Sequence, residues 1–381
     1  MKKYLFLPFI CIMVSLLALT ACSPREDQEE EQEESKEGTE KGAEATPIPE
    51  EEKMSMEKWQ LRGIEPISFT YANFPPASTF PCVQMEEYKR KLEEYSDGQI
   101  TVETHPGGTL LGAKNIFEGV KSGVADIGCF AMSYHPGQFP LTQVMDLPLG
   151  FPNAKAPTML LYDMYKMHTP AEFDDVVVLT LFTCPPAAFM TTKPIETLDD
   201  LKGYKLRVSG TGVGVIKALG GEPDGMPMSE TPEAIQKGRV KGIVSSMEIL
   251  KDFNFASYTP HVSPANLHVV TFAVVMNRKK WDSLPEQVQV VMRGMGRSHA
   301  AWTADYVDQH VDEALEWSKE KYDIKIHTLS TETREEMNKR FQPLFEAYVE
   351  SANKAGLDGD AILKQVVKMK PNYEAKYLPT P

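Results

Sequence analysis

Along residues 67–131, segments in which apolar residues recur with the period of a strand alternate with segments in which they recur with the period of a helix. This pattern predicts a strand–helix–strand–helix–strand unit. Segments rich in β-branched and aromatic residues indicate strands at residues 67–74, 99–105 and 124–131. Segments with apolar residues at helical spacing indicate helices at residues 83–96 and 115–121. Gly123 follows the second helix, at a position where glycine commonly ends a helix. Because strands joined by helices usually run parallel, this order predicts a largely parallel, doubly wound α/β sheet.

The second half of the chain repeats this organisation. Residues 232–244 pass from an amphipathic helix through Gly238 into an apolar strand, as residues 117–128 do through Gly123. Further strands are predicted at residues 176–183, 205–208 and 269–276. The first of these is apolar throughout, as expected of a strand buried on both faces. The repeated organisation predicts two α/β lobes, which a length of 381 residues also favours.

The last third of the chain is predicted to be mainly helical. Apolar residues recur at helical spacing through residues 284–322, which predicts one long helix or two collinear ones, and a further helix is predicted at residues 331–355. At a rise of 1.5 Å per residue, the first segment would span about 58 Å. That length exceeds a single lobe, so we expect this helix to brace both lobes.

The first 22 residues have the pattern of a lipoprotein signal. Lys2 and Lys3 precede an apolar stretch that ends near Leu19, as in secretory signal peptides. The sequence Leu-Thr-Ala-Cys at residues 19–22 resembles the bacterial lipoprotein box, which implies a signal peptide at residues 1–21 and acylation of Cys22. An uncleaved membrane-spanning helix is the alternative, although the apolar stretch is near the lower length limit for a span.

Charge is concentrated just after this signal. The chain has a net charge of -14, and residues 23–58 contain 14 acidic and 5 basic residues with few apolar ones. Such a composition predicts a disordered acidic linker at residues 22–58, between Cys22 and the folded part. A strongly acidic chain lacks the clustered Lys and Arg that neutralise phosphates, so we expect no nucleic-acid binding.

Motifs for catalysis or cofactor binding are missing from the sequence. The Gly210-x-Gly212-x-Gly214 stretch departs from the dinucleotide fingerprint, and no P-loop, serine-hydrolase or zinc-protease motif occurs. We therefore expect a helix that starts close to a ligand or strand there, and no cofactor, metal or enzymatic activity. The cysteines beyond Cys22 are widely spaced at residues 82, 129 and 184, which leaves open one disulfide or three buried thiols.

Arg207 is the strongest candidate for a binding residue. It lies inside the apolar strand Lys-Leu-Arg-Val at residues 205–208, just before the glycine-rich turn. A guanidinium among apolar side chains is costly unless its planar fork is paired. The chemistry alone leaves two alternatives, an internal salt bridge and a bidentate clamp for a ligand carboxylate.

Several motifs resemble those of the solute-binding proteins of tripartite ATP-independent periplasmic (TRAP) transporters, in particular the dicarboxylate-binding-protein family. The matching stretches are residues 118–128, 146–150, 198–203, Arg207, 218–220, 226–228 and 277–285. The chain departs from the family pattern at Val240-Lys241-Gly242, where the family has Val-Asp-Gly. The similarity covers roughly residues 66–320, and the motifs are specific jointly.

This resemblance implies a two-lobed α/β periplasmic-binding-protein (Venus flytrap) fold that closes on a ligand. Lobe 1 would comprise residues 59–185 with part of 269–310, and lobe 2 residues 186–268 with part of 311–381. The protein would lie outside the cytoplasm, anchored to a membrane by lipid on Cys22. It would bind a small organic acid and pass it to the permease subunits of a TRAP transporter. A sensory protein that presents its ligand to a receptor would have the same sequence features.

The resemblance also implies a set of binding residues. Arg207 would pair with the substrate carboxylate, and the other positions are Asn73, Ala131, Met132, Met228, Ser245 and Ser246. Independently of the family, residues 131–132 and 245–246 follow predicted strands, where open α/β sheets bind ligands. Many relatives have a second Arg near residues 184–192, but this chain has an apolar, Pro-rich segment there. We therefore expect an apolar wall from Phe189, Met190, Met132 and Met228, and a monocarboxylate ligand, aromatic or branched.

Overall fold

The computed structural model describes residue 61 and residues 63–378. The predictions for the signal peptide at residues 1–21, for Cys22 and for the linker at residues 22–58 lie outside the described residues. Among the helices in the described part, none combines the length and the apolar character needed to cross a membrane.

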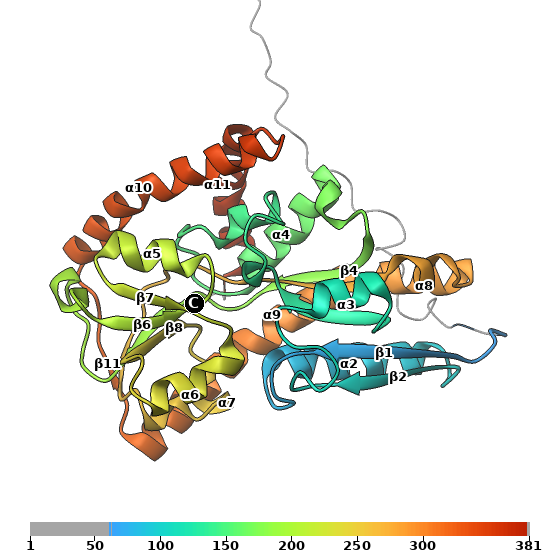
Figure 1. The fold of residues 1–381 in the computed structure, drawn as a ribbon, viewed down its shortest axis with the longest axis horizontal. Coiled ribbons are helices and arrows are strands. Elements are labelled where there is room, and N and C mark those ends of the chain that lie inside the picture. Colours follow the sequence, from blue (N-terminus) through green and yellow to red (C-terminus); the bar gives the residue numbers. More distant parts are fainter. Residues whose placement is uncertain (1–60, 62, 379–381) are drawn as a thin grey trace, which may run out of the picture. The chain divides into compact units, whose positions relative to one another are not determined.

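The described residues form two β-sheets, and the first has five strands in the order β2-β1-β3-β10-β4. Figure 1 shows β1, β2 and β4 of this sheet, and β6, β7 and β8 of the second. These strands are β1 (Ile67–Asn73), β2 (Ile100–His105), β3 (Ile127–Ala131), β4 (Val176–Thr183) and β10 (Thr271–Asn277). Strand β1 pairs in parallel with β2 and β3, whereas β10 pairs antiparallel with β3 and β4. All five lie within a few residues of the predicted strands. The antiparallel direction of β10 was not expected. This strand enters the first sheet directly after β9 of the second sheet, and not through a helical crossover.

The second sheet within the described residues has six strands in the order β11-β9-β5-β8-β6-β7. They are β5 (Ala188–Thr191), β6 (Lys205–Val208), β7 (Glu222–Gly225), β8 (Gly242–Ser245), β9 (His261–Ser263) and β11 (Lys325–Ile326). Strands β7, β6 and β8 run parallel, and β5 is antiparallel to both β8 and β9. Each sheet is therefore mixed. In each, one strand enters from the other lobe and runs antiparallel to both of its neighbours: β10 in the first sheet and β5 in the second. We refer to the parts built on the first and second sheets as lobe 1 and lobe 2.

Helices cover both sheets. The helices are α2 (Phe80–Tyr95), α3 (Ile116–Ser122), α4 (Lys155–His168), α5 (Gly212–Leu219), α6 (Thr231–Gln236), α7 (Ile249–Asp252), α8 (Arg278–Asp282), α9 (Glu286–Tyr322), α10 (Thr331–Lys354) and α11 (Gly359–Tyr377). Short 3-10 helices include η2 (Met132–Tyr134), η3 (Thr142–Asp146), η4 (Ala171–Phe173), η5 (Leu198–Leu201), η6 (Met228–Glu230) and η7 (Phe255–Ser257). Helix α3 ends at Gly123 with φ +82°, as the sequence predicts.

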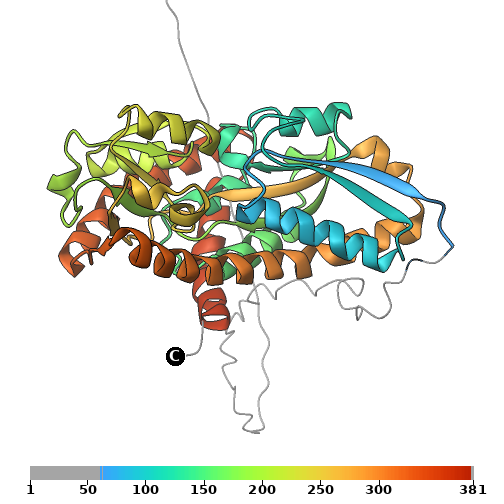
Figure 2. The same cartoon turned by 90° about the horizontal axis from the view of Figure 1, so that it is seen from below.

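The long helix α9 braces both lobes, as expected from its length. It packs against β4, α4 and α2 in lobe 1 and against α7 and η7 in lobe 2. Figure 2 shows it running beneath both groups of strands. At 1.5 Å per residue, its 37 residues span about 55 Å. Helix α10 continues onto α5 of lobe 2, and α11 returns to α4 of lobe 1, so the end of the described chain also joins the two lobes.

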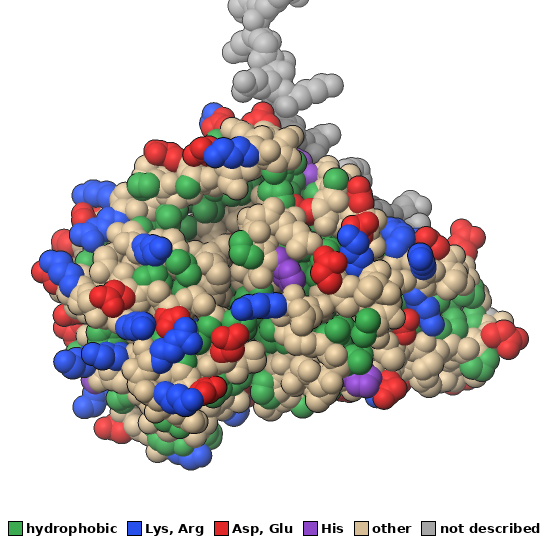
Figure 3. All heavy atoms as spheres, in the orientation of Figure 1, with side chains coloured by type: hydrophobic (Ala, Val, Ile, Leu, Met, Phe, Trp, Pro, Cys, Tyr) green, Lys and Arg blue, Asp and Glu red, His purple; other side chains and the backbone are tan. Residues whose placement is uncertain are grey.

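Successive side chains of a strand point to opposite faces of the sheet, and the buried apolar side chains of lobe 2 follow this alternation. In β5, Phe189 belongs to the core between the second sheet and α10, whereas Met190 belongs to the core on the opposite face. In β6, Leu206 and Val208 share the core of Phe189, which places Arg207 on the other face. On the face shown in Figure 3, basic and acidic side chains are interspersed with apolar ones. The fold thus places this buried cation on the face of the second sheet opposite the core that contains Phe189.

Candidate functional site

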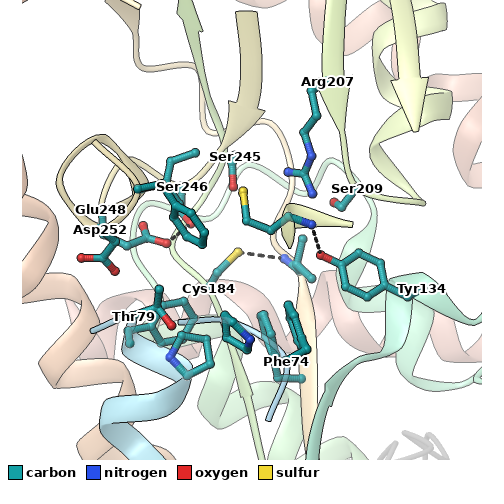
Figure 4. Close-up of a pocket in the computed structure, with 18 residues that line it drawn as sticks. Phe74, Thr79, Tyr134, Cys184, Arg207, Ser209, Ser245, Ser246, Glu248 and Asp252 are labelled. Atoms are coloured by element: carbon teal, nitrogen blue, oxygen red, sulfur yellow. Dashed lines mark hydrogen bonds between the residues drawn. The ribbon is translucent and has the colours of Figure 1, made fainter. Parts of the chain in front are cut away.

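A cavity lies where residues of the two lobes meet. Lobe 1 and the adjoining crossover segments line it with Phe74, Pro75, Thr79, Phe80, Pro81, Tyr134, Cys184, Val270 and Phe272. Lobe 2 lines it with Arg207, Ser209, Met228, Ser245, Ser246, Glu248, Ile249, Asp252 and Phe253. The labelled side chains in Figure 4 surround this space from β6, β8, the start of α7, η2 and the end of β1.

Arg207 is buried in the wall of this cavity without an ionic partner. It is 1% exposed, and its Nε and Nη2 donate to the backbone oxygen of Met226 at 3.2 and 2.8 Å. Burial lowers the pKa of the guanidinium below its ordinary value, and the neighbouring Tyr134 hydroxyl opposes this shift. No described carboxylate lies within salt-bridge distance of Arg207, so the internal salt bridge considered from the sequence is not present among the described residues. An arginine remains charged even when buried, and its remaining donors are available for an anion.

Hydrogen bonds join the two lobes beside Arg207. The Met228 backbone N–H of lobe 2 donates to the Tyr134 hydroxyl of lobe 1 at 3.1 Å. The Thr211 hydroxyl donates to Asp146 of lobe 1 at 3.3 Å, and Asp146 also accepts from the Thr271 backbone N–H at 3.0 Å. These contacts hold the lobes against each other at the edge of the cavity.

The part of the cavity formed by the start of α7 is acidic. Glu248 and Asp252 line it, and Glu248 is 2% exposed. The Ser246 hydroxyl donates to Glu248 Oε1 at 2.6 Å, and His310 Nε2 lies 2.7 Å from Asp252 Oδ1. Burial raises the pKa of the Glu248 carboxyl to about 7. The hydrogen bond with Asp252 raises the pKa of His310, which favours its protonated form.

Aromatic rings form the apolar wall on the side of lobe 1. Phe74 and Phe272 stack with ring centroids 6.5 Å apart, and Phe80 meets Phe272 edge-on at 5.7 Å. On the side of lobe 2, Phe253 adds a further ring to the lining. The cavity therefore combines one guanidinium, one acidic part and an apolar aromatic wall.

Four of the nine predicted binding residues line this cavity, namely Arg207, Met228, Ser245 and Ser246. Asn73 does not, because its side-chain amide donates to the Pro81 backbone oxygen at 2.6 Å and accepts from the Phe74 N–H at 3.0 Å. Its neighbour Phe74 takes the place at the cavity. Cys22, the predicted lipidation site, lies outside the described residues.

The other four predicted residues are also placed away from this cavity. Ala131 and Met132 are fully buried at the end of β3, where the Met132 sulfur accepts from Thr142 at 3.2 Å. Phe189 and Met190 are buried on opposite faces of β5, a strand paired on both edges. The apolar wall expected from Phe189, Met190 and Met132 is therefore supplied by other residues, chiefly Phe74, Phe80 and Phe272.

Sequence reasoning missed Tyr134, Glu248 and Asp252. Tyr134 lies three residues past the end of β3, and the acids lie three and seven residues past the end of β8. The strand-end rule that selected Ser245 and Ser246 pointed to connections that line the cavity, but not to their later residues. An Asp and a Glu four residues apart at a predicted strand end were the available signal.

The three cysteines of the described part are free and buried, which answers the question that their spacing left open. Cys184 lines the cavity, where its sulfur accepts from the Val270 backbone N–H at 3.1 Å. Among the described residues, no group of three or more His, Cys, Asp or Glu side chains has an arrangement that could hold a metal ion.

Comparisons with known proteins agree with this architecture. The model of the family "Bacterial extracellular solute-binding protein, family 7" matches residues 71–352. A TRAP periplasmic solute-binding protein from Desulfovibrio salexigens is 46% identical, with a TM-score of 0.75 over 81% of this chain and 97% of that one. That protein was solved as an open complex with the C-terminus of a symmetry mate in its ligand-binding site.

Two further relatives are more distant. A marine metagenome TRAP solute-binding protein, described as specific for aromatic acids and solved with 3-hydroxybenzoate, is 26% identical. The match has a TM-score of 0.78 and covers 82% of this chain and 100% of that one. The outer membrane transporter protein TsaT of Comamonas testosteroni is 25% identical over 73% of this chain and 84% of its own length. The chain therefore belongs to family 7 of the bacterial extracellular solute-binding proteins and is a TRAP solute-binding protein.

Proposed function

We propose that this protein captures a small organic acid by pairing the ligand carboxylate with Arg207, and releases it to a TRAP permease without transforming it. The observation that carries this proposal is a buried guanidinium that faces a cavity and has no described anionic partner. Desolvating a charge is costly, and a ligand carboxylate offsets that cost with two parallel charge-assisted hydrogen bonds. Ser209, Ser245 and Ser246 offer further hydrogen bonds to the ligand, and Met228 apolar contact.

The lining favours an acid with one carboxylate and an apolar body. Arg207 is the single Lys or Arg among the described residues that line the cavity. A second carboxylate would meet either the rings of Phe74, Phe80 and Phe272 or the acids Glu248 and Asp252, without a described cation to neutralise it. The aromatic acid bound by the 26% identical relative supports this substrate class.

Isothermal titration of the purified protein tests the ligand class. We expect benzoate, phenylacetate or a branched 2-oxo acid to bind at least tenfold more tightly than succinate or malate, because a second ligand carboxylate would be desolvated without a described cation to pair with it. Methyl phenylacetate, which has the same body without the charge, serves as the control and should not bind measurably. A dicarboxylate that binds more tightly than every monocarboxylate would contradict the proposal.

We further propose that the protein is held at a membrane outside the cytoplasm by lipid on Cys22. The support is the sequence of residues 1–22, whose apolar stretch ends in Leu-Thr-Ala-Cys. Several acyl chains on one residue make a stable anchor. Radiolabelled palmitate should therefore be incorporated into the wild-type protein but not into Cys22→Ser. Absence of label in the wild type, or equal labelling of both proteins, would exclude lipid on Cys22.

A further inference from the structure

Two buried carboxylates in the cavity wall each keep one oxygen without a hydrogen-bond partner. Glu248 Oε1 accepts from Ser246, but Glu248 Oε2 is buried and unpartnered. Asp252 Oδ1 contacts His310, but Asp252 Oδ2 is likewise buried and unpartnered. Both side chains line the same cavity as Arg207. An ionised carboxylate accepts hydrogen bonds through both oxygens, so a ligand donor at these two atoms would favour the ionised form of each acid.

The protein itself does not supply these donors. No described Lys or Arg forms a salt bridge with Glu248, and His310 is shared between Asp252 and Glu313. Burial raises the pKa of Glu248 to about 7, as expected for an acid without a cationic partner. Buried polar atoms in native proteins are nearly always satisfied by the protein, by water or by a bound group. These two oxygens lie on the wall of the cavity, where a ligand can supply a donor.

The acids and Arg207 occupy opposite sides of the cavity. Figure 4 shows Glu248 and Asp252 at one side of the labelled residues, with Arg207 and Tyr134 at the other and Ser245 and Cys184 between them. A single ligand that spans the cavity would therefore meet a cation at one end and unpartnered acceptors at the other. The aromatic wall formed by Phe74, Phe80 and Phe272 borders the space between.

We propose that Glu248 and Asp252 form a subsite for a hydrogen-bond donor of the ligand, so that the substrate is an organic acid bearing a hydroxyl or a protonated amine away from its carboxylate. This proposal rests on the proposed function, because the same ligand is held by its carboxylate at Arg207. The donor would satisfy Glu248 Oε2, Asp252 Oδ2 or both. The subsite excludes a second carboxylate by charge repulsion and disfavours a purely apolar end, which would leave both oxygens unpartnered.

Matched ligands titrated into the purified protein test the subsite. The parent compound is phenylacetate, and the donor-bearing compounds are its 3- and 4-hydroxy and its 3- and 4-aminomethyl derivatives. We expect at least one donor-bearing compound to bind tenfold or more tightly than phenylacetate. Tyramine, which carries donors but no carboxylate, shows whether the acidic subsite can bind a ligand without Arg207.

Variants at Glu248 identify the donor. Glu248→Met removes both acceptor oxygens while keeping side-chain length, so it should erase the advantage of every donor-bearing compound over phenylacetate. Glu248→Gln keeps one neutral acceptor, so it should erase the advantage of an amine but preserve much of that of a hydroxyl. Glu233→Gln, the same change at an exposed position on α6, should alter neither. Melting curves without ligand show whether each variant is folded, and Asp252→Asn provides a second variant if Glu248→Met is not.

Each result separates this proposal from the carboxylate clamp. Equal affinities for phenylacetate and all its derivatives, unchanged in Glu248→Met and Asp252→Asn, would overturn the donor subsite and leave the clamp intact. Binding of tyramine that matches the donor-bearing acids, and that depends on Glu248, would support the subsite and overturn the clamp. The absence of binding by every compound would overturn both.

Discussion

Arg207→Ala is expected to weaken the binding of an organic acid by about 1,000-fold. Removing one partner of a buried, hydrogen-bonded charge pair typically costs about 2–5 kcal/mol, and about 1.4 kcal/mol corresponds to a factor of ten. In this variant the ligand carboxylate would enter a cavity whose described lining contains no other Lys or Arg. Titration calorimetry with the tightest acid of the panel measures the loss.

The stability of the free protein distinguishes a clamp from a structural residue. Arg207 forms no described salt bridge. Its guanidinium donates to the Met226 backbone oxygen and interacts with the Tyr134 hydroxyl. Its removal relieves a desolvated charge, so the melting temperature of unliganded Arg207→Ala should equal or exceed that of the wild type. Arg207→Lys keeps the charge but loses the planar fork, and should bind with intermediate affinity.

Arg239→Ala is the matched control, because Arg239 is an exposed arginine of the same lobe that pairs with Asp224 at 2.7 Å. Its ligand affinity should remain that of the wild type. Affinity for the acid within threefold of wild type in Arg207→Ala would make Arg207 a structural residue and remove the basis of the clamp.

The strands were the most predictable part of the fold, because their apolar character reflects their burial directly. The eight residues of β4 are apolar or Thr throughout, and the structure buries this strand between β10 and the helices α4 and α9. Strand β5 was missed because it has only four residues and follows Pro185 and Pro186, which suggest a loop. Its strand conformation depends on pairing with β8 and β9, which are distant in sequence.

Among the helices that were missed, the two longest were missed for opposite reasons. Helix α4 is apolar on most sides, since it packs between β4, α9 and α11, so its sequence lacks a clear amphipathic period. Helix α11 is mostly polar, contains Pro371 and buries little beyond Ile362 and Val366. Those two apolar residues are four positions apart and could have indicated a helical face.

The candidate site was predictable only as far as local rules reach. Arg207 stood out because a guanidinium within an apolar strand requires a partner, and Ser245 and Ser246 because ligands bind at strand ends. Asn73 and Phe74 show the limit: the two neighbours end the same strand, but the amide braces the start of α2 and the ring lines the cavity. Which of two adjacent side chains faces a cavity depends on the other lobe, and no local pattern in the sequence reports that.

Gly210→Ala is expected to weaken ligand binding by about 100-fold while leaving the stability of the free protein nearly unchanged. Gly210 lies between β6 and α5, and a Cβ there would overlap the backbone carbonyl oxygen of Ser133 in lobe 1. A backbone oxygen cannot avoid the overlap by changing rotamer, as a flexible side chain can. The lobes would therefore have to separate at this point. The hydrogen bonds from Met228 to Tyr134 and from Thr211 to Asp146, which join the lobes nearby, would be strained with it.

The clash destabilises only the closed arrangement, in which the lobes touch. It therefore lowers the affinity for ligand and leaves the folding of each lobe unchanged. A ligand that requires the closed state binds with an affinity reduced by the fraction of molecules that can close, so about 2.8 kcal/mol of strain gives a factor of about 100. Gly214→Ala on α5 is the control, because its Cβ would meet only Leu344 Cδ2 at 3.2 Å, the end of a flexible side chain. Calorimetry and melting curves should show weak binding with unchanged stability in Gly210→Ala alone. Wild-type affinity in that variant would mean that binding does not require this contact, whereas a large fall in melting temperature would make Gly210 a packing residue of the folded core.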